Sequence, residues 1–97
     1  MSVIVHIEHP VHDYARWKAA FDSDPIGRQR GGVRRYRISR AVDDPLLVII
    51  DLEFEDLPTA QTFRQALDRM WQTPQAQTPL ANVPTARIEE VTESATV

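Results

Sequence analysis

The chain has 97 residues, of which 42% are hydrophobic, and this length suits one small domain better than two. Its formal net charge of -3 argues against nucleic acid or an anionic membrane as the main partner, because either would require a concentrated basic surface. The absence of cysteine excludes disulfides, a thiolate nucleophile and zinc–cysteine or iron–sulfur centres. No apolar run approaches the roughly 18 residues of a membrane span and no secretory signal is recognisable, so we expect a cytoplasmic protein.

The hydrophobic pattern predicts six elements in the order strand, helix, strand, strand, helix, strand. The first strand is expected over residues 3–8, where apolar and polar side chains alternate, and Pro10 is expected to end its ladder. Asp13 is placed to cap the helix that follows. Three aromatic residues recur at helical spacing and should form the apolar stripe of this helix: Tyr14, Trp17 and Phe21.

The segment "SDPIG" after this helix predicts a stop and a restart. Ser23 or Asp24, followed by Pro25, should begin a short helical turn that the pair Gly31 and Gly32 ends. The charged residues of this region either bind a polar group or cap the interrupted helix and hold it together by local ion pairs. The second function is favoured. They are Asp22, Asp24, Arg28 and Arg30.

Two strands and a second helix follow. The strands are expected over residues 33–40, "VRRYRISR", and over residues 46–54, "LLVIIDLEF". Asp56 and Pro58 should begin a helix whose apolar stripe consists of Ala60, Phe63, Leu67 and Met70 or Trp71. Residues 73–84 hold three prolines and are expected to form a loop with at most a helical turn at 75–77, and a last strand is expected over 85–92.

This order of elements predicts an α+β fold, the ferredoxin-like βαββαβ arrangement, with a four-stranded antiparallel sheet and both helices on one face. The helix-covered face should hold the core, which consists of Val3, Val5, Ile7, Tyr36, Ile38, Val48, Ile50, Leu52, Phe54 and Ile88 packed against Tyr14, Trp17, Phe21, Phe63 and Leu67. The opposite face, called the open face from here on, should carry Ile4, His6, Glu8, Arg35, Arg37, Leu47, Ile49, Asp51 and Glu53. This mixture of apolar and charged residues suggests a partner sheet more than water.

Three segments of the chain resemble a known superfamily: "HPVHDYARWKAAFDSDPIGR", "GVRRYRISR" and "DDPLLVIIDLEFEDLPTAQTF". They are similar to small bacterial proteins of the dimeric α+β barrel superfamily, which includes the antibiotic-biosynthesis monooxygenases. The resemblance implies that residues 1–97 form one domain whose open face pairs with a second copy to make a barrel. It also implies that any activity needs no cofactor.

The charged residues of the open face are therefore expected at the dimer interface. Neighbouring strands place Arg35 and Arg37 beside Asp51 and Glu53, where cross-strand ion pairs can balance the charges. His6 should lie in the same interface.

The three histidines, His6, His9 and His12, are evenly spaced but are not expected to form a metal site. With a period of two, His6 and His9 point to opposite faces of the first strand, and His12 lies beyond Pro10 at the helix entry. A zinc site needs three or four converging ligands. We therefore expect no metal.

His9 is the candidate catalytic residue, because its parity places it at the rim of the cleft between sheet and helices. Tyr14, Trp17, Lys18 and Tyr36 are the candidate ligand-binding residues. One interpretation is a cofactor-independent monooxygenase or cyclase that acts on a small aromatic or polyketide-like molecule, with His9 as proton acceptor. The alternative is a non-catalytic homodimer that binds a small ligand, in which Tyr14 and Trp17 only pack and His9 hydrogen-bonds a loop carbonyl.

Overall fold

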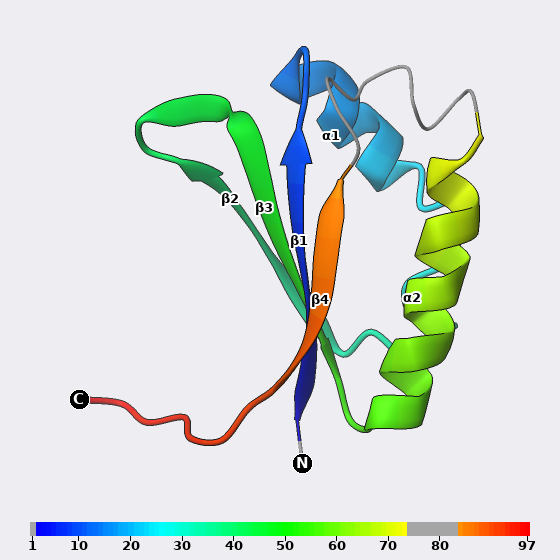
Figure 1. Ribbon diagram of the computed structural model, residues 1–97, viewed down its shortest axis with the longest axis vertical. Coiled ribbons are helices and arrows are strands. Elements are labelled where there is room, and N and C mark those ends of the chain that lie inside the picture. Colours follow the sequence, from blue (N-terminus) through cyan, green and yellow to red (C-terminus); the bar gives the residue numbers. More distant parts are fainter. Residues whose placement is uncertain (1, 74–83) are drawn as a thin grey trace.

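The computed structural model describes residues 2–73 and 84–97. The elements follow the expected order: β1 (Val3–Pro10), α1 (Tyr14–Asp22), β2 (Arg35–Ala41), β3 (Asp44–Phe54), α2 (Leu57–Trp71) and β4 (Thr85–Glu90). The strands form a four-stranded antiparallel sheet in the order β2-β3-β1-β4, and both helices lie on one side of it (Figure 1). The predicted α+β, βαββαβ arrangement is confirmed.

Strand β1 lies at the centre of the sheet because it pairs on both sides. Val5 is opposite Leu52 of β3 and also opposite Ile88 of β4. Buried and half-buried residues alternate strictly along β1, as the period of two predicts. The buried residues Val3, Val5 and Ile7 face the helices, as predicted.

Strand β1 runs two residues further than expected. Pro10 is opposite Leu47, and the amide of Val11 donates a hydrogen bond of 2.8 Å to the carbonyl of Leu46. Since adjacent amides point in opposite directions, the missing N–H of Pro10 faces away from β3. Pairing with β4 has already ended at Glu8 on that side, so the ladder loses no bond.

Both helices begin at the predicted caps. An Oδ1 atom of Asp13 accepts a hydrogen bond from the amide of Arg16 at 3.2 Å, and Oδ1 of Asp56 accepts one from the amide of Thr59 at 2.9 Å. Each bond satisfies one of the free amides of a first helical turn. Pro58 lies in the first turn of α2, where it displaces no helical hydrogen bond.

The predicted helical turn after α1 is present as a single turn over residues 28–32, and it is not extended into a helix. The amide of Gly31 donates to the carbonyl of Gly27 and the amide of Val33 to the carbonyl of Arg28, both at 2.9 Å, and Gly32 ends the turn with a φ of 95°. Asp24 has a φ of 52° and Gly27 one of 84°, and these left-handed residues interrupt any continuous helix. Strand β2 consequently begins at Arg35, two residues later than predicted.

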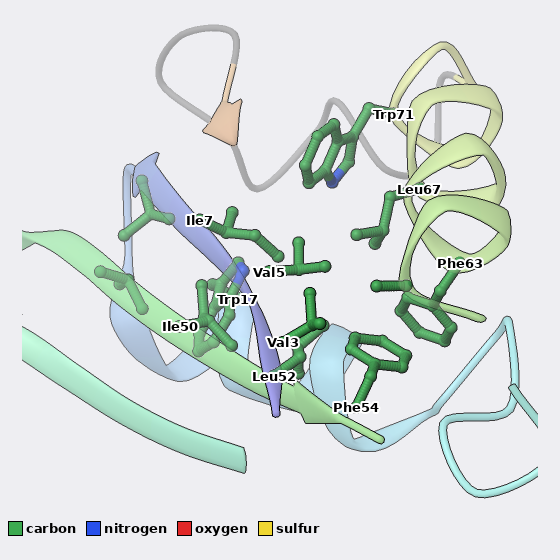
Figure 2. Packing of buried hydrophobic residues seen from close by; sticks show 13 residues of the cluster. Val3, Val5, Ile7, Trp17, Ile50, Leu52, Phe54, Phe63, Leu67 and Trp71 are labelled. Carbon is green, nitrogen blue, oxygen red and sulfur yellow. The ribbon is translucent and has the colours of Figure 1, made fainter. Parts of the chain in front are cut away.

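The core lies between the sheet and the helices. Figure 2 shows Phe63, Leu67 and Trp71 of α2 directed toward Val3, Val5 and Ile7 of β1. Ile38, Ile88, Tyr14 and Phe21 pack against this core while staying partly exposed. Fully or nearly fully buried residues are Val3, Val5, Ile7, Val11, Trp17, Val48, Ile50, Leu52, Phe54, Ala60, Phe63, Leu67 and Trp71.

The prediction that Tyr36 is a core residue is wrong. Its side chain has the predicted parity, since Tyr36 is opposite the buried Leu52, but 47% of the residue is exposed. Strand β2 is an edge strand, and the helices cover the centre of the sheet better than this edge (Figure 1).

Two further expectations concern the end of the chain. Most of the expected loop over 73–84, with its helical turn at 75–77, lies outside the described residues. Strand β4 ends at Glu90, two residues before the predicted end. Within the described part, neither helix has the length and apolar character that crossing a membrane requires.

Candidate functional site

A cavity of about 230 Å³ lies between the sheet and the two helices. Its lining comes from β1, α1, the turns after α1, β3 and α2, and includes Ile7, His9, Trp17, Phe21, Arg28 and Trp71. Most of these side chains are apolar. The volume is smaller than the roughly 300 Å³ that pockets for drug-sized ligands reach. A ligand for this cavity must therefore be small.

His9 is one of the polar residues that line the cavity. It is 6% exposed, on the helix-covered face near the end of β1. Its Nδ1 atom has no hydrogen-bond partner within the described residues. The expected alternative, a bond from His9 to a loop carbonyl, is not found at this nitrogen. Burial lowers the pKa of His9 to about 4, so the imidazole is neutral at pH 7.

Two tryptophans from different helices surround the imidazole. The ring of Trp17 in α1 lies 5.8 Å from the His9 ring, and the ring of Trp71 in α2 lies 5.4 Å away with its edge toward it. Phe21, one turn after Trp17, continues the aromatic wall at 5.2 Å from the Trp17 ring. These flat apolar surfaces are suited to stacking on a planar ligand.

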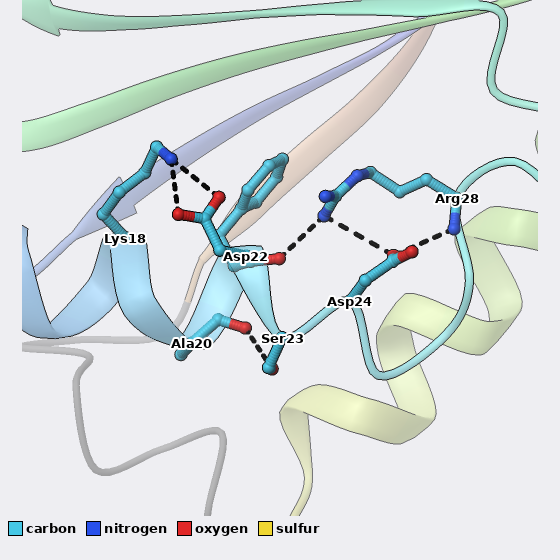
Figure 3. Close-up of polar contacts among 7 residues, drawn as sticks. Lys18, Ala20, Asp22, Ser23, Asp24 and Arg28 are labelled. Atoms are coloured by element: carbon cyan, nitrogen blue, oxygen red, sulfur yellow. Dashed lines mark hydrogen bonds and ion pairs between the residues drawn. The ribbon is translucent and has the colours of Figure 1, made fainter.

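Arg28 and Asp24 form the charged part of the lining. The guanidinium of Arg28 stacks on Phe21 with its carbon 3.9 Å from the ring centroid, and its Nη1 donates to the carbonyl of Phe21 at 2.8 Å. Asp24 Oδ1 accepts from the Arg28 amide at 2.9 Å and lies 3.5 Å from Nη1 (Figure 3). These contacts hold the turns after α1 together, as expected for these charged residues. Arg28 also lines the cavity.

The predicted site residues do not all reach the cavity. His9 and Trp17 line it together, whereas Tyr14, Lys18 and Tyr36 are not among the described lining residues. Lys18 donates to both carboxylate oxygens of Asp22, at 2.6 and 2.7 Å (Figure 3). Tyr14 packs on Trp17 and lies under the guanidinium of Arg40, whose carbon is 4.5 Å from the ring centroid.

Trp71 was not predicted to belong to the site, and Arg28 was predicted only as one of the charged residues after α1. Trp71 was recognised only as a member of the apolar stripe of α2, because helical spacing cannot distinguish a core tryptophan from one beside a cavity. Its proximity to His9 depends on how α2 packs across β1. The sequence therefore held no signal for it beyond aromatic character.

The open face of the sheet carries a second polar cluster around His6. Nδ1 of His6 lies 2.7 Å from Asp51 Oδ1, and Nε2 lies 3.0 Å from Glu8 Oε2. Arg35 pairs with Glu53 at 2.9 Å, as the cross-strand register predicts. The Arg37–Asp51 pair is not formed within the described residues, although the two residues are opposite each other, because the Asp51 carboxylate binds His6 instead.

The carboxylates around His6 favour its protonated form. Burial alone would lower the pKa of His6, but the hydrogen bonds to Glu8 and Asp51 and the charges of Asp51 and Glu89 outweigh it and raise the pKa. The pKa of His6 is thus raised by neighbouring carboxylates, whereas the pKa of His9 is lowered by burial. Within residues 2–73 and 84–97, no three His, Asp or Glu side chains are grouped to hold a metal.

No protein-family model matches the chain, and no curated protein is significantly similar to it in sequence. Solved structures match nearly all of it. A Bordetella bronchiseptica protein described as an antibiotic biosynthesis monooxygenase has a TM-score of 0.75 at 16% identity, with 95% of this chain and 98% of that chain covered. A dimeric ferredoxin-like protein from an uncultured marine organism has a TM-score of 0.68 at 11% identity, with 97% and 98% covered.

SnoaB, a cofactor-independent oxygenase from Streptomyces nogalater, has a TM-score of 0.63 at 21% identity, with 99% of this chain and 96% of that chain covered. The chain has the fold of the dimeric α+β barrel proteins. The resemblance implied by the sequence motifs is confirmed for the fold. In this fold, the His9 cavity and the open face lie on opposite sides of one sheet.

Proposed function

We propose that the protein is a homodimeric, cofactor-independent monooxygenase that oxidises a small aromatic molecule in the cavity between sheet and helices. The observation that supports this most is the imidazole of His9, which lines the apolar cavity close to Trp17 and Trp71 and whose buried Nδ1 has no hydrogen-bond partner within the described residues. A buried polar atom without a partner destabilises the fold, which favours a functional role for this imidazole. Likeness in fold to SnoaB, a cofactor-independent oxygenase, supports the reaction type.

His9 would act as a proton acceptor. A neutral imidazole can take a proton from a bound aromatic molecule, and the resulting electron-rich anion can reduce oxygen. In the overall reaction one oxygen atom of O₂ enters the ring as a new carbonyl oxygen. The other atom leaves as water with the two hydrogens that the substrate loses. The substrate supplies all four electrons, so no further reductant is required.

We expect an oxygen-uptake assay with 1-naphthol to show conversion to the naphthoquinone, with one labelled atom incorporated from isotope-labelled O₂. The His9→Leu variant should be slower by roughly a hundredfold to ten-thousandfold, the usual contribution of a general base. His12→Leu is the matched control, because His12 is exposed and lies outside the cavity. Equal rates for the wild-type protein and His9→Leu would contradict the role of His9.

A second candidate function is binding without catalysis. The pKa of His9, lowered to about 4, makes the imidazole a weak base at pH 7, while it can still accept a hydrogen bond. A protein that binds the aromatic probe but shows no oxygen uptake would be a non-catalytic ligand-binding homodimer.

The homodimer is proposed from the open face. Ile4, Leu47 and Ile49 are only half-buried there, beside charged groups of both signs. A second copy of the sheet would cover the apolar residues and offer each charge an opposite one, as isologous interfaces do. The structurally similar dimeric ferredoxin-like protein supports this assembly.

Light scattering is expected to give about twice the chain mass of 11.1 kDa at micromolar concentration. A stable monomer would contradict the proposed barrel. Substitution of arginine for Ile49 should shift the protein toward the monomer, because it buries an unpaired cation at the proposed interface. Arginine at exposed Val42 on the β2–β3 turn is the control and should leave the mass unchanged.

The dimer should also weaken at alkaline pH. Glu8, Asp51, Glu53 and Glu89 share the open face with Arg35, Arg37 and Arg87, so a protonated His6 makes the face electrically neutral. Because the pKa of His6 is raised, the imidazole carries this positive charge below that pKa and loses it as pH rises through it, which leaves the face with a net negative charge. Dilution series at about pH 6 and about pH 9 should show weaker association at the higher pH, and His6→Gln should remove that difference.

A further inference from the structure

We propose, resting on the homodimer proposed above, that the segment after β4, residues 91–97, pairs as an extra strand with the free edge of β2 in the second copy. Each copy would then give one segment to its partner and receive one in return. Three observations support this: a free and basic edge at β2, an exposed segment of matching length that carries a glutamate, and a strand order that keeps the two apart within one chain.

The outer edge of β2 has backbone groups that are free to pair. β2 is bonded to β3 on one side, and no strand of the described residues pairs with its other side. The carbonyl of Glu53 faces β2, because it accepts a hydrogen bond from the amide of Arg34 at 2.8 Å. Arg35 is opposite Glu53 and therefore directs its own backbone groups toward β3, and this direction alternates along a strand. The residues whose backbone groups point outward are Tyr36, Ile38 and Arg40.

The side chains along β2 make this edge basic. Residues 34–40, "RRYRISR", contain four arginines and no acidic residue. Arg35 pairs with Glu53, but within the described residues no carboxylate pairs with the other three, which are Arg34, Arg37 and Arg40. Charged side chains on an edge strand discourage pairing with other sheets, whereas a strand of opposite charge is attracted. The edge of β2 therefore favours an acidic strand.

The segment 91–97, "VTESATV", has the properties that this edge requires. The amide of Val91 donates to the carbonyl of Ser2 at 3.0 Å, and all residues from 92 to 97 are exposed. Four of the seven residues are β-branched and none is proline or glycine, which favours an extended strand. Glu93 supplies the negative charge. Seven residues are also the length of β2.

The strand order prevents the segment from covering β2 of its own chain. β4 and β2 are at opposite edges of the sheet, three strand spacings or about 14 Å apart. Crossing this width would use about four residues at about 3.4 Å each, which leaves too few to pair along β2. Figure 1 shows the segment leaving β4 on the side away from α2.

A second copy brings the two elements together without this crossing. If its sheet covers the open face and the two-fold axis runs along the strands, the rotation reverses the strand order. The β2 strand of the second copy then lies beside β4 of the first. The segment that follows β4 can reach that edge directly, and the symmetry gives each copy one segment and one edge.

The experiment measures amide hydrogen exchange in the intact protein and in a variant that lacks residues 92–97, with light scattering on both. In the intact dimer the outward amides of β2 should be protected, and in the truncated variant they should exchange at least about tenfold faster. The amides of Arg35, Arg37 and Ser39 point toward β3, so they are the internal control and should change little.

Charge complementarity is tested by Glu93→Lys. The reversed charge should speed exchange of the outward amides about two- to fivefold, which is the effect of one exposed ion pair. Asp68→Lys is the matched control, because it makes the same charge reversal on the exposed side of α2 and should leave the β2 amides unchanged. Equal exchange in the two variants would contradict the role of Glu93.

Failure of this exchange is distinguishable from failure of the homodimer. If light scattering gives a dimer but the outward amides of β2 are unprotected in the intact protein, the exchange is overturned and the homodimer stands. Protection that persists in the truncated dimer overturns it equally, because another strand would then cover the edge. A monomer at micromolar concentration would overturn both.

Discussion

Replacement of His9 by leucine is expected to stabilise the protein at pH 7. The buried Nδ1 of His9 has no partner within the described residues, and an unsatisfied buried group of this kind costs about 1–3 kcal/mol. Leucine is apolar and fits a wall formed by Trp17, Trp71 and Ile7. The free energy of unfolding should therefore rise by about 1–3 kcal/mol. A stabilising substitution that also slows the proposed reaction would identify a residue retained for function.

The same substitution should change the pH dependence of stability. The pKa of His9 is about 4 in the folded state against 6.5 in the unfolded state. As pH falls from 6.5 toward 4, the unfolded chain binds a proton that the folded chain excludes, so stability present above the unfolded pKa is progressively lost. The loss approaches about 3 kcal/mol at the acid end. His9→Leu should lack this loss.

Urea unfolding of the wild-type protein, His9→Leu and the control His12→Leu, each at several pH values between about 7 and about 4, measures both effects. The exposed His12 should give curves close to those of the wild-type protein. A loss of stability in His9→Leu at pH 7 would show that His9 is a structural residue and would argue against its proposed role.

Substitution of alanine for Gly32 should be strongly destabilising. Gly32 has a φ of 95°, and a Cβ atom added there would overlap Cγ2 of Thr59 in α2. The left-handed backbone costs an L-residue about 1–2 kcal/mol, and overpacking adds about 1–3 kcal/mol. The expected loss in denaturant unfolding is about 2–5 kcal/mol.

Gly27→Ala is the matched control for this effect. Gly27 also has a positive φ, 84°, but an added Cβ would come no closer than 3.8 Å to Arg30. It should show the backbone cost alone, about 1–2 kcal/mol. Equal losses for the two variants would show that the turns after α1 do not pack tightly on α2.

Much of this fold follows from local patterns in the sequence. Alternation along β1, the helical stripe of Trp17 and Phe21, and the caps Asp13 and Asp56 each depend on neighbours within a few residues. The order of these elements then leaves few topologies for a chain of this length. Parity also placed His6 and His9 on opposite faces correctly, because it is a property of one strand.

The tertiary structure alone decided which side chains meet across the sheet and the cavity. Asp51 pairs with His6 of β1 and not with Arg37 of β2, although both are its cross-strand neighbours, and periodicity cannot rank two equivalent partners. Tyr36 has core parity yet is half exposed, because exposure depends on where the helices end over the sheet. The cavity beside His9 exists because Trp17, Trp71 and Arg28, distant in sequence, pack around a space that they leave incompletely filled, and such packing depends on three-dimensional shape that no local pattern encodes.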